Sequence, residues 1–314
     1  MPLGTNHDTK TTADKFIPEL WSDDTIAAYK SNLVLANLVT RMNHKGSKGD
    51  TIHIPNPGRG AASVKQAQSQ VNLITDTAGS IDVVIDKHYE YSRLIEDIVS
   101  VQALDSMRAF YTDDAGYALA RQVDFDLHVL GSALQGGTLD TSPGTIAAPA
   151  IDYAASTSVI GGDGSTDYNG TNESALTDAG IRKMIQTLDD QDVPQSDRAL
   201  VVPPSERNNL MGIARFTEQS FTGEMAGGNT IRNGLIGDIY GIPVFVSTAC
   251  PAAASSDKAG MLFHKSAFAL VEQMGVRSQT QYKQEYLGDL LTVDTIYGVK
   301  TLRDDAGVSF VVPA

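Results

Sequence analysis

The amino-acid sequence predicts an α+β fold, and three patterns carry that prediction. Apolar residues that recur every three or four positions over 104–134 predict one long helix. Two segments that alternate polar and apolar residues, 50–55 and 81–91, predict an antiparallel hairpin. The part of the chain from residue 260 onward is rich in further strand patterns. Helices and strands therefore occur in blocks, without the strand–helix–strand repeat of a parallel sheet.

The chain opens with a polar, threonine-rich stretch, residues 1–15, which we expect to form an arm. It lacks the basic start and apolar run of a signal peptide. The segment Phe16–Trp21 follows and ends in the only tryptophan of the chain, which we expect to anchor the arm. Ser22 or Asp23 can cap a helix at this point. Apolar residues then continue at helical steps through Ile26, Tyr29, Leu33, Leu38 and Met42.

The predicted hairpin has an unusually long connection between its strands. Residues 56–80 are rich in Gly, Ala, Ser, Gln and Asn. Hairpin loops usually need about 2–5 residues, and structureless loops beyond about 12–15 residues are usually functional or disordered. A segment of this length cannot cover its own backbone, so we expect it to lie on another surface.

The helix stripe over 104–134 corresponds to roughly 45 Å at 1.5 Å per residue. We expect its opposite side to be a solvated, mainly acidic face, and Gly136–Gly137 to end the helix. The predicted solvated residues are Asp105, Asp113, Asp114, Arg121, Asp124 and Asp126.

Residues 138–172 are rich in Gly, Ser, Thr and Ala, and we interpret them as a surface insertion rather than core. A helix is predicted over 176–188, with Thr177 or Asp178 as its cap, and another over 205–214. Strands are predicted over 198–204, 241–247, 260–263, 267–272, 290–302 and 308–312.

Composition excludes several classes of protein. The formal charge is 24 − 38 = −14, which argues against a chain whose whole surface binds nucleic acid. The single cysteine, Cys250, permits no internal disulfide and excludes a Cys2His2-type zinc site. No run of about 18 apolar residues that could span a bilayer occurs.

Motifs for catalysis or cofactor binding are missing from the sequence. It holds no P-loop, no nucleophile elbow and no dinucleotide fingerprint, and its six histidines are scattered. No histidine lies near Cys250 in sequence, which favours an inert thiol. Asp163 begins an alternation that resembles a calcium loop, but Tyr168 replaces its glycine and the final Glu is missing. Asp189–Asp192 is best explained as a solvated turn. We therefore expect no enzyme activity, no cofactor and no bound metal.

Charge is distributed unevenly along the first half of the chain. Residues 41–65 carry five bases and one acid, 5 − 1 = +4, whereas residues 66–130 carry four bases and eleven acids, 4 − 11 = −7. A basic loop beside an acidic helix suits contact between copies of one chain. The alternative is a chance distribution of solvated charges.

Three motifs, in this order, carry a resemblance to a known family. Phe16–Trp21 followed by Ser31–Val34 resembles the N-terminal arm and helix of tailed-bacteriophage major capsid proteins. Gly237–Val244 with Ser247 is similar to their glycine-x-x-x-glycine-x-x-valine strand. Tyr297–Lys300 with Arg303–Val308 is similar to their closing strands. Together the motifs span nearly the whole chain and resemble the Hong Kong 97-type shell fold.

The resemblance implies a division of the chain into named parts. These are an N-terminal arm and helix (1–45), an extended E-loop hairpin (46–92), a spine helix of the peripheral domain (93–137), a Gly/Ser-rich insertion without family counterpart (138–175), an axial domain (176–259), and peripheral return strands (260–314).

The resemblance also implies a function. Copies would form pentamers and hexamers of an icosahedral head shell around double-stranded DNA, without sequence-specific DNA binding and without a membrane. The shell would assemble in the bacterial cytoplasm with a scaffolding protein, a portal and decoration proteins, and become part of the virion. Contacts between subunits are expected from Phe16, Trp21, Arg59 and Lys65, with Arg59 and Lys65 facing acids of a neighbour's spine helix.

Two other functions remain open at this point. The strand-rich C-terminal part also suits another phage structural component, such as a tail-tube or decoration protein. A hydrolase could draw sequence-distant site residues from the acids between Asp113 and Asp126 and from His128.

Overall fold

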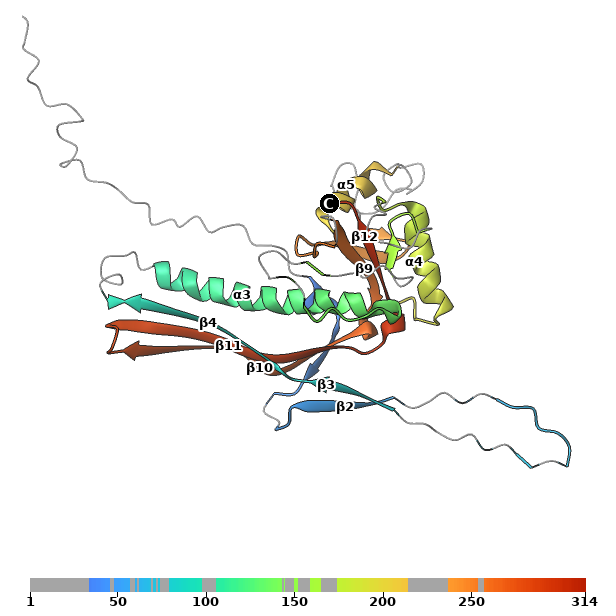
Figure 1. Cartoon of the computed structure of the whole chain (residues 1–314), viewed down its shortest axis with the longest axis horizontal. Coiled ribbons are helices and arrows are strands. Elements are labelled where there is room, and N and C mark those ends of the chain that lie inside the picture. The colour runs from blue at the N-terminus through green and yellow to red at the C-terminus, as the bar shows by residue number, and fades with distance from the viewer. Residues whose placement is uncertain are drawn as a thin grey trace, which may run out of the picture.

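The computed structural model has 314 residues. The structure describes residues 34–45, 48–56, 60, 62–68, 70–71, 73, 79–97, 106–142, 144, 150–151, 159–164, 174–213, 237–253 and 257–314, and the side chains of these except 106–109 and 159. They form an elongated body with a sheet along one helix, a second sheet at one end and a projecting pair of strands (Figure 1).

The long helix α3, Ser106–Leu130, lies along a four-stranded sheet (Figure 1). Ala115 and Leu119 of the helix pack against Leu291 and Val293 of the sheet, which confirms the predicted stripe at these positions. A short 3-10 helix, η2 (Gly131–Gly136), continues α3 and ends where the glycines predict. The strands in spatial order are β1 (Thr40–Asn43), β10 (Phe268–Lys283), β11 (Gly288–Thr301) and β4 (Lys87–Glu96).

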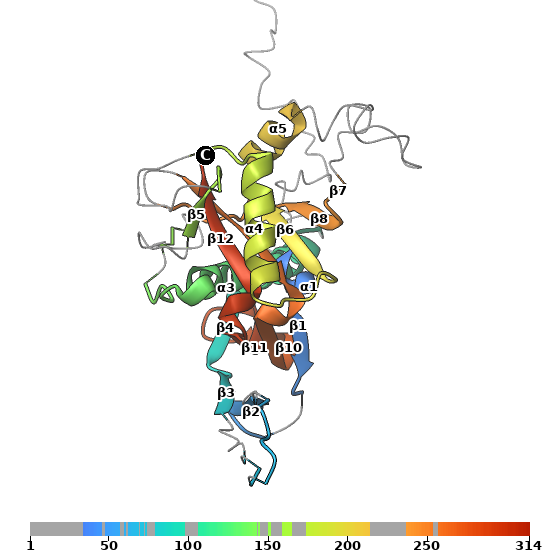
Figure 2. The same cartoon turned by 90° about the vertical axis from the view of Figure 1, so that its right-hand side faces the viewer.

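The second sheet has six strands and holds the main core. Its fully buried centre includes Val201, Phe263 and Phe310, and Figure 2 shows helix α4 lying across its strands. The strand order is β5 (Val159–Gly161), β12 (Gly307–Val312), β9 (Lys258–His264), β6 (Arg198–Val202), β8 (Ile242–Val246) and β7 (Asp238–Ile239). Around it lie α4 (Asp178–Asp190), α5 (Pro204–Gly212), η4 (Lys265–Ala267) and η5 (Asp304–Ala306).

Several predicted elements are confirmed in this region. The hydroxyl oxygen of Thr177 accepts the backbone N–H of Gly180 at 3.1 Å and caps α4, as the sequence predicts. The strands around 198–202 and 242–246 are also present. Strands β9 and β12 belong to the same sheet as β6. A boundary at residue 260 between an axial and a peripheral part therefore cuts through one sheet and does not separate two sheets.

Two predictions are wrong. The helix expected to continue to Met42 is limited, among the described residues, to α1 (Leu35–Leu38), because 40–43 pair with β10 as a parallel strand. Part of the segment interpreted as a surface insertion belongs to the core, since β5 pairs with β12 and Gly161 and Gly162 are buried. Residue 162 is a glycine because a side chain there would collide with the backbone of 174–175. The glycine-rich sequence alone does not reveal this contact.

The predicted hairpin exists but is built differently. Strands β2 (Thr51–Asn56) and β3 (Gly79–Val84) form a separate two-stranded sheet. The segment 81–91, expected as one strand, breaks at 85–86, and β4 continues into the four-stranded sheet. We call β2, β3 and the residues between them the projecting hairpin, because it extends away from both sheets (Figure 1).

None of the described helices is both long enough and apolar enough to cross a membrane.

Candidate assembly surface

The projecting hairpin is held at its base by the body of the protein. Val83 and Ile85 are buried against Val271 of β10, and the partly buried Ile52 packs on the same cluster. The backbone N–H of Ile85 donates to the carbonyl of Asp50 at 2.7 Å. Apolar packing at the base therefore fixes the direction of the hairpin.

The two strands of the hairpin are also joined by polar side chains on their exposed side. His53 and Asp82 are direct partners in the register, and Nδ1 of His53 lies 2.6 Å from Oδ1 of Asp82. The hydroxyl of Ser80 donates to the same carboxylate at 3.0 Å. These hydrogen bonds, chiefly the one with His53, lower the pKa of Asp82. Both histidines predicted to lie on strands, His53 and His88, are exposed.

Beyond its strands the hairpin presents large apolar side chains to solvent. Val64 is 94% exposed, Leu73 88% and Val71 60%. Burial of apolar area stabilises by about 25 cal/mol per Å², and clustered exposed apolar side chains mark interaction sites. In the single chain these three side chains leave their apolar area in water, a cost that a covering surface would remove.

Of the four residues predicted to make contacts between subunits, the structure describes only Lys65. It is exposed, and its ammonium group donates to the backbone carbonyl of Gln66 at 2.8 Å. Phe16, Trp21 and Arg59 lie outside the described residues. Lys65 thus lies next to the exposed Val64, on the segment that connects β2 and β3.

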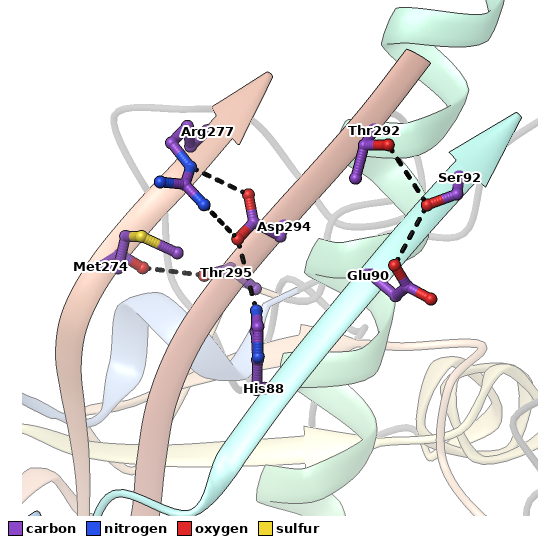
Figure 3. A network of polar contacts seen from close by, with 8 residues as sticks. All are labelled: His88, Glu90, Ser92, Met274, Arg277, Thr292, Asp294 and Thr295. Atoms are coloured by element: carbon purple, nitrogen blue, oxygen red, sulfur yellow. Dashed lines mark hydrogen bonds and ion pairs between the residues drawn. The ribbon is translucent and has the colours of Figure 1, made fainter. Parts of the chain in front are cut away.

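The sheet face opposite α3 carries a network of polar side chains centred on Asp294 (Figure 3). The guanidinium of Arg277 donates to both carboxylate oxygens, at 3.1 and 2.8 Å, and Nε2 of His88 lies 3.3 Å from Oδ2. The hydrogen bond from Arg277 is the largest cause that lowers the pKa of Asp294. Asp294 is only 6% exposed, so it is an anchored, ionised group that its partners largely cover.

Glu90 lies beside this network with part of its bonding capacity unused. Its Cα is the register partner of Asp294, and its carboxylate accepts the hydroxyl of Ser92 at 3.1 Å (Figure 3). Like charges directly opposite each other on a sheet are unfavourable. Glu90 and Asp294 line a groove of about 450 Å³ together with His88 and Arg277. An additional cation from outside would relieve the repulsion between the two acids.

The acids predicted to lie on the solvated side of the long helix do not all lie there. Asp124 is fully buried and Asp126 is 6% exposed, whereas Asp113 is exposed. Asp126 accepts the hydroxyl of Tyr297 at 2.7 Å and lies 3.2 Å from the ammonium of Lys87. The prediction is wrong for Asp124 and Asp126 because α3 is covered on two sides, by the sheet and by the segment that contains α1. A basic loop cannot reach these two acids.

Asp124 instead links two distant parts of the chain. Its Oδ1 accepts the backbone N–H of Leu35, 89 residues away, at 3.0 Å, at the start of α1. Its Oδ2 has no hydrogen-bond partner among the described residues. Burial raises the pKa of Asp124 to about 6, because desolvation outweighs the backbone hydrogen bonds.

The residues proposed for a hydrolase site do not form an accessible site. His128 is fully buried, 3.7 Å from Asp124, and neither ring nitrogen has a hydrogen-bond partner among the described residues. Burial lowers the pKa of His128 to about 3. Cys250 is equally enclosed, and burial raises the pKa of its thiol to about 12, which confirms the interpretation as an inert thiol.

The sequence also contains two acidic motifs, one at the end of α4 and one that begins at Asp163. The acids at Asp189–Asp192 lie at the exposed end of α4, as predicted, and Asp189 is 2.6 Å from the buried guanidinium of Arg198. Of the calcium-like alternation, the structure describes Asp163 but not residues 165–173.

Sequence reasoning missed a second exposed apolar surface. The turn between β10 and β11 exposes Tyr282, Tyr286 and Leu287, and the hydroxyl of Tyr282 donates to Asp97 at 2.8 Å. Residues 277–281 read Arg-Ser-Gln-Thr-Gln, a polar run without apolar alternation, so the sequence offered no clear signal for the full length of β10. With the projecting hairpin, the body thus presents contact surfaces at both extremities.

A long helix on a four-stranded sheet, a second sheet at one end and a projecting hairpin are the features of a shell-forming structural protein. A sequence profile of the family described as "Phage capsid protein" matches residues 89–310, which is most of the chain. The chain therefore belongs to this family. It is a major capsid protein of a tailed phage with the Hong Kong 97-type fold.

Solved phage structures share this fold over nearly their whole length. A chain from Mycobacterium phage Che8 is 26% identical, with a TM-score of 0.72, and the match covers 94% of this chain and 97% of that one. A capsid chain of cyanophage P-SCSP1u is 18% identical, with a TM-score of 0.71 and coverage of 99% and 96%. A chain from Gordonia phage Cozz is 13% identical, with a TM-score of 0.65 and coverage of 100% and 98%. No curated protein sequence matches the chain.

Proposed function

We propose that copies of this chain assemble into pentamers and hexamers that form a closed icosahedral shell around double-stranded DNA. The observation that carries this proposal is the projecting hairpin, because its apolar side chains Val64 and Leu73 are almost fully exposed in the single chain. In a shell these side chains are covered by a neighbour. The protein has no catalytic role in this proposal, and the shell assembles in the host cytoplasm with a scaffolding protein, a portal and decoration proteins.

The named parts of the family fold follow from the same proposal. The projecting hairpin corresponds to the E-loop, α3 to the spine helix of the peripheral domain, and the region around β6 and β8 to the axial domain. The axial region surrounds the five-fold and six-fold positions, and the E-loop lies over an adjacent subunit.

The acceptor for Lys65 on the adjacent subunit is the groove that contains Glu90 and Asp294. The spine helix still presents the exposed Asp113, but Asp124 and Asp126 are buried there, and the groove places two acids side by side. The groove holds two acids on neighbouring strands, and Arg277, on the far side of β11 from Glu90, pairs among the described residues with Asp294 only. A lysine ammonium from another copy supplies the cation that this arrangement lacks.

A charge-swap experiment tests the contact. Lys65→Glu and Glu90→Lys should each lower the yield of closed particles, and the double variant should recover it. One exposed ion pair contributes only about 0.2–1 kcal/mol, but the same contact recurs at every subunit of the shell. Lys48→Glu, which changes an exposed lysine near the base of the hairpin, serves as the control. Particles are counted by negative-stain microscopy and sedimentation.

The results of this experiment distinguish a failure of the proposed Lys65 contact from a failure of the proposed shell function. If all variants assemble like the wild type, Lys65 does not bind this groove, although the shell function stands. If the wild-type chain, expressed with its phage scaffolding protein, yields only monomers, small oligomers or tubes, the proposed shell function is wrong.

A further inference from the structure

A pocket of about 430 Å³ lies where the first described residues cross the long helix and the sheet. Its wall is mainly apolar and includes Ala120 and Val123 of α3, with Tyr297 of β11 at its base. Val276 forms one edge and is 61% exposed. Apolar surface that lies open to solvent at a pocket this large is unfavourable unless something covers it.

The rim of the pocket carries two bases, Arg41 and Lys45, and one acid, Glu272, in a chain whose formal charge is −14. Arg41 is exposed, and its Nε donates to the backbone carbonyl of Ala36 at 2.9 Å. No carboxylate among the described residues forms an ion pair with Arg41. Lys45, also on the rim, lies 3.4 Å from Glu272. The pocket therefore suits a ligand that combines apolar side chains with carboxylates.

The chain itself contains such a segment close by. Residues 16–24 read Phe-Ile-Pro-Glu-Leu-Trp-Ser-Asp-Asp, with three acids, no base and two aromatic side chains. The first described residue is Val34, and the pocket is lined by Ala36 and Asn37 immediately after it. The arm thus begins at the edge of the pocket.

The connection between this segment and the pocket is short. Residues 25–33 separate the two, and a segment of this length spans at most about 30 Å even when fully extended. A tether this short keeps residues 16–24 near the pocket at an effective concentration well above that of a second copy in dilute solution.

We propose that this pocket is the docking site of the chain's own arm, with residues 16–24 covering the apolar wall and their acids facing Arg41 and Lys45. Docking covers Val276 and gives a carboxylate partner to Arg41, which forms no ion pair with the described residues. A subunit with a docked arm does not offer that arm to a neighbour, so release of the arm becomes a step that precedes arm contacts between copies. The proposal concerns the single subunit and holds whether or not the shell function does.

Trp21 is the only tryptophan, so its fluorescence reports the position of the arm directly. The full chain is measured at a concentration where sedimentation velocity shows single subunits, and a synthetic peptide of residues 14–26 gives the undocked reference. We expect the emission of the full chain to be blue-shifted and its quenching by acrylamide to be several-fold weaker than that of the peptide. This protection should not depend on protein concentration.

Two variants remove the docking site in different ways. Arg41→Glu reverses the charge of the rim, and Ala120→Phe fills the pocket from an exposed position on α3. Both should raise quenching of Trp21 toward the peptide value, while circular dichroism confirms that the fold is kept. Lys48→Glu, an exposed lysine that does not line the pocket, should leave quenching unchanged. Combining Arg41→Glu with Glu19→Lys should restore part of the protection.

Two results would overturn the proposal. In one, Trp21 of the wild-type chain is as accessible as in the free peptide, or both pocket variants leave its protection intact. In the other, protection appears only as the concentration rises and larger species form, which would assign the pocket to the arm of a second copy.

Discussion

Replacing Asp124 by asparagine should stabilise the subunit at neutral pH. The carboxylate is fully buried on α3, and burial raises its pKa from the ordinary 3.8 to about 6. The difference of about 2 pKa units corresponds to roughly 3 kcal/mol at about 1.4 kcal/mol per unit. An asparagine has the same shape, and its amide oxygen can still accept the N–H of Leu35. The variant therefore keeps the link to α1 without burying a charge.

The sign of the effect depends on pH. Because the pKa of Asp124 is raised in the folded state, the contribution of Asp124 to stability falls as pH rises from about 4 to about 6 and stays lower above that, whereas the contribution of His128 is common to both proteins. Asparagine does not titrate. The free energy of unfolding should therefore be similar for both proteins near pH 4, and higher for Asp124→Asn by up to about 3 kcal/mol near pH 7.5.

Urea unfolding of unassembled subunits, followed by circular dichroism between pH 4 and pH 8, measures this difference. Asp113→Asn, on the exposed part of the same helix, is the matched control and should show no comparable rise. Asp124→Ala should be less stable than Asp124→Asn at every pH, since it also loses the hydrogen bond to α1. An Asn variant that is less stable than the wild type at pH 7.5, or a difference that does not change with pH, would refute the reasoning.

Three further substitutions test the packing of the core, each by thermal or urea unfolding. Tyr297→Phe removes the hydroxyl that donates to the buried Asp126, and should cost about 1–3 kcal/mol, with Tyr286→Phe on the exposed turn as a neutral control. Gly260→Ala places a methyl group against the ring of Phe310 and 2.8 Å from the carbonyl of Val201, and should cost about 1–3 kcal/mol; an unchanged midpoint would show that the ring moves aside freely. Thr177→Ala removes the cap of α4 and should cost about 1 kcal/mol, whereas Thr177→Ser should not.

Patterns that depend on neighbouring residues were predictable. The cap at Thr177, the glycines that end the long helix and the alternation along the strands all act within a few residues, so each element could be placed from local spacing. The length and composition of residues 56–80 also predicted a projecting segment, because a loop of this kind cannot cover its own backbone. The exposure of the Lys65 side chain is expected for the same reason.

Other features depended on distant partners. The helix expected to run to Met42 gives way to strand β1, because the parallel register with β10 pairs residue 42 with Val271. The three residues of β5 look like a glycine-rich loop in sequence, and become core only because β12, near the C-terminus, pairs with them. A one-dimensional pattern carries no information about such partners.

Local sequence patterns were enough to place the long helix, α4 and several strands, to locate the surplus of negative charge, and to carry the resemblance to a phage shell protein. Only the tertiary structure decided which charges face water. Asp113 and Asp124 lie on the same helix, yet one is exposed and the other buried, since α1 packs over the second but not over the first. Burial is set by what covers a side chain, and the covering segment here is 89 residues away.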